Sequence, residues 1–96
     1  MRQVIISPEA ENDLKEIGIF TENNWGRKQR KKYLAQLVER MHFLAAHRAL
    51  VKRRYDLPDS PYCFHEGKHV IFFREVPQGI EIIRVLHEVM DFSLHL

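Results

Sequence analysis

Histidines and basic side chains in the C-terminal half are the residues of this 96-residue chain best suited to chemistry. The six histidines stand at positions 42, 47, 65, 69, 87 and 95. His87 ends an apolar run and, in an antiparallel hairpin, would lie near Lys68 and His69. An imidazole acting as a general base beside cations is what RNA cleavage by a 2′-hydroxyl requires. The alternative is a histidine at a strand end that forms only local hydrogen bonds.

Other catalytic patterns are missing from the sequence. Only His65 and His69 are close enough along the chain to share a metal ion, and no third ligand lies nearby, so we predict no metal site. The sequence has no Gly-rich phosphate loop, no Gly-x-Ser-x-Gly elbow and no His-Glu-x-x-His pair. We therefore expect no cofactor.

Two arginines, Arg74 and Arg84, stand inside apolar runs. An arginine in such a place needs a carboxylate partner or a route to water. The candidate partners are Glu75, Glu81 and Asp91. Two interpretations remain open: structural ion pairs, or a clamp for an acidic segment of a partner.

The apolar runs themselves predict a β-hairpin over residues 69–87. Residues 76–79 separate two stretches rich in β-branched and aromatic side chains, and Gly79 can adopt the positive φ that a short loop often needs. Strict alternation would place His69, Ile71 and Phe73 opposite Val70, Phe72, Arg74 and Val76. On the second strand it would separate Ile80, Ile82, Arg84 and Leu86 from Glu81, Ile83, Val85 and His87. Neither face is polar, so something must cover each of them.

The N-terminal half predicts a short strand over residues 3–6 and two helices. Ser7 suits an N-cap and Pro8 the first helical position, while Gly26 suits the end of this helix. The spacing places Ala10, Leu14, Ile17 and either Phe20 or Thr21 on its buried face. A second helix over about residues 28–46 must run antiparallel to the first, because the connection is so short. Its apolar stripe consists of Tyr33, Leu34, Leu37, Val38, Met41, Leu44 and Ala45.

The start of the second helix is strongly basic. It carries Arg27, Lys28, Arg30, Lys31 and Lys32. Positive side chains at a helix N-terminus cost a few tenths of a kcal/mol, because the helix dipole is positive there. The simple interpretation is a solvated helix face, and the alternative is a functional use of the charge.

The remaining segments complete an α+β fold with the order β-α-α-β-β-β. Residues 48–61 read as a loop, residues 62–65 as a short strand, and residues 88–96 as an apolar tail that must dock somewhere. We expect one domain over residues 1–96, in which a helical hairpin covers one face of a mostly antiparallel four-stranded sheet. The other face would stay uncovered and mark a partner site, unless the tail covers part of it.

Composition limits the classes of function. The formal net charge of +2 is too small to indicate a nucleic-acid-binding protein, and we expect no sequence-specific binding of nucleic acid. Cys63, the only cysteine, fits a reducing cytoplasm. No run reaches the ~18 apolar residues of a membrane span, and the N-terminus has no long apolar signal region. We expect a complete cytoplasmic protein that does not enter a membrane.

Several segments of the chain together resemble a known family. Gly67, the run His-Val-Ile-Phe-Phe-Arg at 69–74, Ile-Glu-Ile-Ile-Arg-Val-Leu-His at 80–87 and Met90-Asp91 are similar to the C-terminal signature of ParE-type toxins, within the RelE/ParE superfamily. The N-terminal half agrees with the helical hairpin of that family. The agreement there rests on Ser7-Pro8-x-Ala10, Asp13-Leu14, Ile17, Trp25-Gly26 and Tyr33.

The resemblance implies the toxin of a bacterial type II toxin–antitoxin module. Such a toxin forms a hetero-oligomer with a ParD-like antitoxin, and characterised ParE-type toxins inhibit DNA gyrase by binding, without catalysis. On the exposed sheet face we expect antitoxin contacts from Val70, Phe72, Arg74, Ile82 and Arg84. For the target we expect contacts from His87, Met90, Asp91 and Phe92.

Two alternatives stay open. RelE-type relatives cut mRNA on the ribosome, and an endoribonuclease would use His87 with Lys68, Arg74 and Arg84. The catalytic tyrosine that the resemblance implies near the C-terminus has no counterpart in residues 92–96. A non-toxic homologue that only binds the antitoxin is the other alternative, because residues 62–65 read Tyr-Cys-Phe-His where the family usually carries an arginine.

Overall fold

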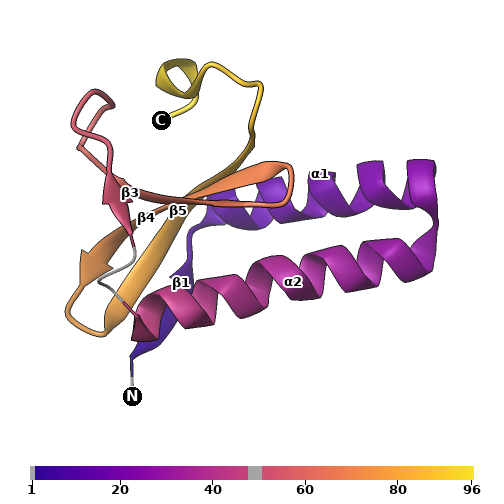
Figure 1. Ribbon diagram of the computed structural model, residues 1–96, viewed down its shortest axis with the longest axis horizontal. Helices are drawn as coiled ribbons and strands as arrows, with labels where there is room; N and C mark the ends of the chain where they lie inside the picture. Colours follow the sequence, from indigo (N-terminus) through magenta and orange to yellow (C-terminus); the bar gives the residue numbers. More distant parts are fainter. Residues whose placement is uncertain (1, 48–50) are drawn as a thin grey trace.

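A computed structural model describes residues 2–47 and 51–96, and in it two helices cover one face of a five-stranded sheet (Figure 1). β1 pairs with β5 in parallel, and all other neighbours are antiparallel. The strand order is β1 (Gln3–Ile6), β5 (Gly79–His87), β4 (His69–Val76), β3 (Tyr62–Glu66) and β2 (Lys52–Arg53).

The predicted α+β class is confirmed, but the predicted strand count of four is wrong. The additional strand, β2, lies in the segment predicted as a loop, of which residues 48–50 fall outside the described part. Two pairs hold it to β3, Lys52 with Cys63 and Arg53 with Tyr62. A strand of two residues is too short to produce a periodic pattern, so β2 cannot be recognised from periodicity.

The first helix, α1 (Pro8–Trp25), begins as its cap predicts. The Ser7 hydroxyl accepts a hydrogen bond from the Ala10 amide and donates one to the Ile83 carbonyl, at 3.1 and 2.9 Å. Of the two candidates for the last buried position, Thr21 is buried and Phe20 is 58% exposed. The Thr21 hydroxyl donates to the Ile17 carbonyl at 2.7 Å, which satisfies it inside the helix.

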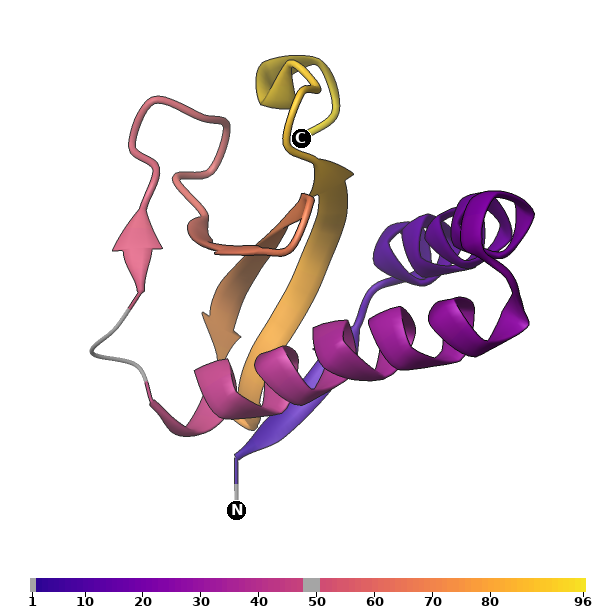
Figure 2. The same ribbon diagram turned by 45° about the vertical axis from the view of Figure 1, so that its right-hand side comes forward.

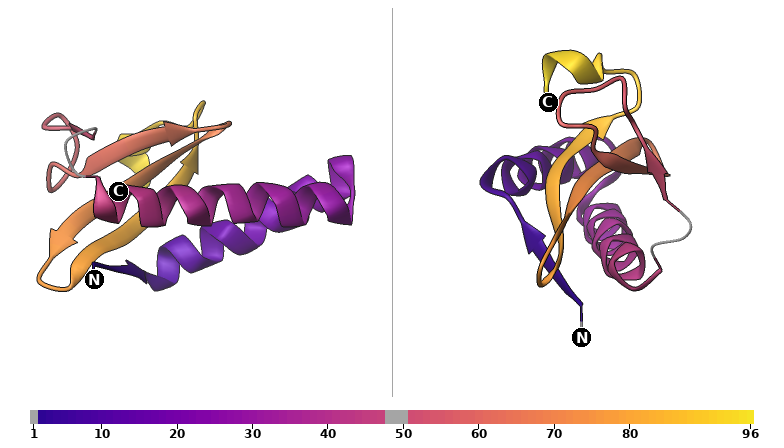
Figure 3. Two further views of the ribbon diagram at one scale, coloured as in Figure 1. Left: turned by 60° about the horizontal axis from the view of Figure 1, so that its bottom comes forward. Right: turned by 90° about the vertical axis from the view of Figure 1, so that its left-hand side faces the viewer.

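The second helix, α2 (Arg27–Ala46), returns alongside α1 in antiparallel direction (Figure 3). Leu37, Met41 and Leu44 are fully buried between the helices and the sheet, as the predicted stripe requires. Figure 2 shows both helices on the same side of the sheet. Neither helix among the described residues is long and apolar enough to cross a membrane.

A β-bulge interrupts the hairpin of β4 and β5. Phe72 pairs with Arg84 and Phe73 with Ile82, so Ile83 has no partner opposite it. The predicted strict alternation is therefore wrong beyond Ile82. Ile80, Ile82 and Val85 belong to the core under the helices, together with Ile71 and Phe73. Leu86 instead joins Val70 and Phe72 in the core on the other face.

The chain covers this other face by itself, which corrects the expectation of an exposed sheet face. Leu57 from the segment after β2, and Phe92 and Leu96 from the tail, pack against Val70, Phe72 and Leu86. Phe72 and Phe92 meet edge to face, with ring centroids 4.9 Å apart. Figure 3 shows the tail and this segment next to each other, and the Arg54 guanidinium lies 5.8 Å from the centre of the Phe92 ring. The alternative that the tail docks here is thus confirmed, with Leu57 as a second contributor.

Gly79 is required where β1 joins the sheet. A Cβ at this position would lie 2.1 Å from the Gln3 carbonyl oxygen. No side chain fits into that space, so the parallel pairing of Gln3 with Gly79 depends on glycine.

Candidate functional site

Three aromatic side chains meet where β4 begins and β5 ends. His69 and His87 are register partners, and their rings stand edge to face with centroids 5.3 Å apart. The Tyr33 hydroxyl lies 2.6 Å from His69 Nδ1 and accepts a hydrogen bond from the Lys68 amide at 3.1 Å. Gly67 leaves room for this tyrosine, since a Cβ there would lie 2.8 Å from the ring. His69 and His87 therefore lie side by side, and Lys68 adjoins them through its backbone, which also accepts the Glu88 amide at 2.9 Å.

Burial keeps the centre of this group uncharged. Burial, with a smaller effect of His87, lowers the pKa of His69 to about 4, against opposing effects of Glu88 and Asp13. His69 is thus neutral at pH 7, and its Nδ1 can accept a hydrogen bond from the Tyr33 hydroxyl. Burial also raises the pKa of Tyr33. The pair serves as a neutral hydrogen-bonded support, because neither group takes or releases a proton readily at pH 7.

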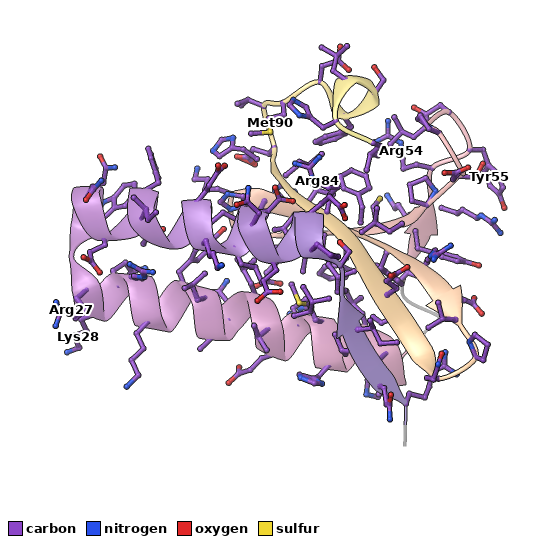
Figure 4. All side chains as sticks on the ribbon, turned by 180° about the vertical axis from the view of Figure 1, so that it is seen from behind. Arg27, Lys28, Arg54, Tyr55, Arg84 and Met90 are labelled. Atoms are coloured by element: carbon purple, nitrogen blue, oxygen red, sulfur yellow. The ribbon has the colours of Figure 1, made fainter. Side chains whose placement is uncertain are left out.

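Arg84 is bound to a carboxylate that the sequence did not suggest. Its Nε and Nη2 both donate to Asp13 of α1, at 2.8 Å each, and its Nη1 donates to the His95 carbonyl at 2.7 Å. Asp13 also accepts the Val85 amide at 2.9 Å. In Figure 4 Arg84 lies between α1 and the C-terminal tail. The only sign of this pair in the sequence is that Asp13 adjoins Leu14, one of the apolar positions predicted for the buried face of α1.

Arg74 lies at the opposite end of the hairpin. Its Nε donates to Glu81 at 2.6 Å, which confirms one of the predicted partners. Arg74 lies five residue steps from His69 along β4, so the pairs Arg74–Glu81 and His69–His87 are about 17 Å apart along the sheet. The four residues of the nuclease interpretation are therefore not brought together: His87 and Lys68 are neighbours, Arg74 is remote and Arg84 is bound to Asp13.

The two histidines that were closest in sequence have separate contacts. His65 Nε2 lies 2.9 Å from a Glu88 carboxylate oxygen, whereas His69 contacts Tyr33. Within the described residues no group of three or more His, Cys, Asp or Glu side chains could hold a metal ion.

An open groove of about 390 Å³ runs between α1 and the end of β5. Exposed apolar side chains border it: Phe20 is 58%, Val89 81% and Met90 43% exposed. Of the four residues expected to contact a target, His87 and Met90 line the groove. The complete lining is Asp13, Glu16, Ile17, Phe20, His69, Val85, His87, Val89 and Met90.

The other two expected target residues are used inside the tail. Asp91 accepts hydrogen bonds from the amide and the hydroxyl of Ser93, at 3.1 and 2.7 Å, and so caps the short 3-10 helix η2 (Phe92–Leu94). Phe92 packs on Phe72.

Of the expected antitoxin residues, Val70, Phe72 and Ile82 are buried, and only Arg74 is largely exposed.

Comparisons with known proteins agree on one class. A solved structure described as the chromosomal ParDE TA system from P. aeruginosa has the same fold, with a TM-score of 0.75 and 19% identity over 91% of this chain and 96% of that chain. The curated relative "Toxin ParE1" of Caulobacter vibrioides is 32% identical over 100% of this chain and 99% of its own length. "Toxin ParE1" of Mycobacterium tuberculosis is 30% identical over 96% of this chain and 95% of its own length. These relatives are toxins.

The family model makes the assignment specific. Residues 4–92 match the model described as the ParE toxin of type II toxin-antitoxin system, parDE. The chain therefore belongs to the ParE toxin family of type II toxin–antitoxin systems, as the sequence resemblance predicts.

Proposed function

We propose that this toxin inhibits DNA gyrase by binding rather than by catalysis, and that a ParD-like antitoxin neutralises it. The observation that carries the non-catalytic part is the separation of the basic residues. A nuclease must surround one phosphate with its base and cations, yet Arg74 lies about 17 Å from His87. Membership of the ParE toxin family supports the gyrase target and the ParD-like partner.

The groove beside α1 is the surface that we assign to partners. It combines exposed apolar side chains with the predicted target residues His87 and Met90. An antitoxin segment that folds on binding can fill such a groove with its apolar side chains. By covering His87 and Met90, the antitoxin would exclude the target. Val70 and Phe72 would take part only if the tail moved, and Ile82 is buried under the helices. Arg74 is therefore the accessible member of the predicted antitoxin set.

Expression in bacteria without the antitoxin tests this proposal against both alternatives. The proposal predicts arrested growth, a loss of plasmid supercoiling and intact mRNA. Cleaved mRNA with normal supercoiling would favour the endoribonuclease. Unimpaired growth would favour the non-toxic homologue, since residues 62–65 lack the arginine that the family usually carries there.

A further inference from the structure

The proposed function leaves the most basic part of the chain without a role. We define the basic tip as the five cations at the start of α2: Arg27, Lys28, Arg30, Lys31 and Lys32. The helical hairpin extends past the sheet, and its turn lies farthest from the sheet (Figure 1). Figure 4 shows Arg27 and Lys28 at this far end. Over residues 19–34 these five cations face a single carboxylate, Glu22.

One of the five cations is part of the structure of the hairpin. Arg30 Nη1 donates to Glu22 at 3.2 Å across the two helices. Its guanidinium also fills the space over Gly18, where a Cβ would lie 2.9 Å from Arg30 Nε. Arg30 therefore joins α1 to α2 and is not available to a ligand.

Among the described residues, the other four cations make no such contact between the helices. At 100° per residue, Lys28 and Lys32 lie on the face of α2 opposite the buried residues Leu37 and Met41. Arg27 and Lys31 lie nearer to α1 and line a surface depression with Glu22 and Arg30. All four are exposed, and within residues 2–47 and 51–96 no hydrogen bond or ion pair engages them.

This arrangement is unfavourable for the isolated protein. The cations stand at the positive end of the α2 dipole, and Gly26 supplies no side-chain cap. Like charges three and four residues apart, such as Lys28 with Lys31 and Lys32, also repel each other. Within the described residues no carboxylate forms an ion pair with these four cations, so an external polyanion would relieve both unfavourable effects.

We infer that the basic tip binds the phosphate backbone of duplex DNA, which deepens the proposed function because gyrase acts on DNA. The four cations span about 7.5 Å of the helix axis, and a duplex carries about one charge per 1.7 Å. Long, flexible side chains on this span can reach two to four phosphates. Such contacts carry no sequence information.

The chemistry of this face favours DNA over an anionic membrane surface. A helix that lies on a membrane places large apolar side chains directly beside its cations. Here the positions between the four cations carry only Gln29 and Arg30. The exposed aromatic side chains nearby, Phe20 and Trp25, belong to α1 and contact each other with ring centroids 5.9 Å apart.

A charge-matched pair of variants tests the inference. Lys28→Ala/Lys32→Ala removes two charges from the basic tip, and Lys15→Ala/Lys52→Ala removes two exposed lysines elsewhere. Binding of each purified protein to a fluorescent duplex is titrated between about 50 and 200 mM salt. The tip variant should bind about tenfold more weakly at low salt, with a slope of log K against log salt smaller by about 1.8, and the control should match the wild type. Equal thermal midpoints verify that all three proteins are folded.

Two further measurements distinguish a failure of the DNA-binding inference from a failure of the proposed function. Equal duplex binding by both variants, or a tip-dependent binding to phosphatidylglycerol vesicles without a change on DNA, would overturn the inference. The same proteins are titrated into gyrase with plasmid, where the tip variant should need more protein than the control to stabilise the cleaved DNA. A wild type without any effect on gyrase would refute the proposed function, while the duplex titration would still decide on the basic tip.

Discussion

Asp13 is the side chain on which the junction of α1 and β5 depends. It accepts two hydrogen bonds from Arg84 and one from the Val85 amide, and its side chain is only 8% exposed. The hydrogen bond with Asp13 raises the pKa of Arg84, so this arginine stays charged throughout the usual pH range. Because Arg84 also donates to the His95 carbonyl, the same contact fixes the C-terminal tail.

Asp13→Ala should lower the free energy of unfolding by about 2–4 kcal/mol, because it leaves a half-buried guanidinium without its carboxylate. Urea unfolding measures the loss. The matched control is Glu81→Ala, which breaks the pair with the 63%-exposed Arg74 and should cost under about 1 kcal/mol. Similar losses in the two variants would contradict the role given to Asp13.

His69 should make stability depend on pH. Its pKa is about 4 in the folded protein and about 6.5 in an unfolded chain, so the unfolded state binds more protons between these values. The contribution of neutral His69 is complete above pH 6.5 and is lost as the pH falls towards 4, up to about 3 kcal/mol. In His69→Gln the decline of stability over this window should be shallower than in the wild type. If the free energy of unfolding fell with pH equally steeply in both proteins, His69 would not be the source of the pH dependence.

At the scale of elements, the C-terminal tail acts as the cover of the second sheet face. Phe92 contributes its ring to this core, whereas Leu94 in the same 3-10 helix is 78% exposed. The tail thus takes the place that an antitoxin was expected to fill. For this reason we assign partners to the groove beside α1 instead.

Phe92→Ala should therefore destabilise the protein by about 1–3 kcal/mol and increase the fluorescence of a dye that binds exposed apolar surface. The substitution uncovers Phe72 and Leu86, which Phe92 packs against. Leu94→Ala, in the same turn of helix, should change stability by no more than about 0.5 kcal/mol and leave the dye signal unchanged. If the dye signal rose equally in both variants, the tail would not be the cover that we describe.

The elements with local signals could be predicted from the sequence, and the contacts between distant residues could not. Ser7, Pro8 and Gly26 mark the helix ends through their own backbone preferences, so both helices were predicted within one residue. The bulge at Ile83 has no such signal, and without it the faces of Arg84 and Leu86 cannot be assigned. The pair of Asp13 and Arg84 joins residues 71 apart, a contact that depends on the whole fold.

At the scale of the whole molecule, α1 connects the two surfaces that we assign to partners. Ile17 and Phe20 line the groove, and Trp25, eight residues after Ile17 and about 12 Å along the helix axis, precedes the basic tip. The protein measures 36 × 32 × 23 Å, so a complex of gyrase with cleaved DNA could touch both surfaces at once. The part of the sheet that holds Val70 and Phe72 remains closed within the chain.

The most direct test of the non-catalytic gyrase mechanism uses purified components. The toxin is added to gyrase with relaxed plasmid, and in a parallel reaction to translating ribosomes with a labelled mRNA. We predict that it blocks supercoiling, that cleaved plasmid accumulates and that the mRNA stays intact. We also predict that an equimolar ParD-like antitoxin restores supercoiling. Undisturbed supercoiling together with cut mRNA would contradict the mechanism.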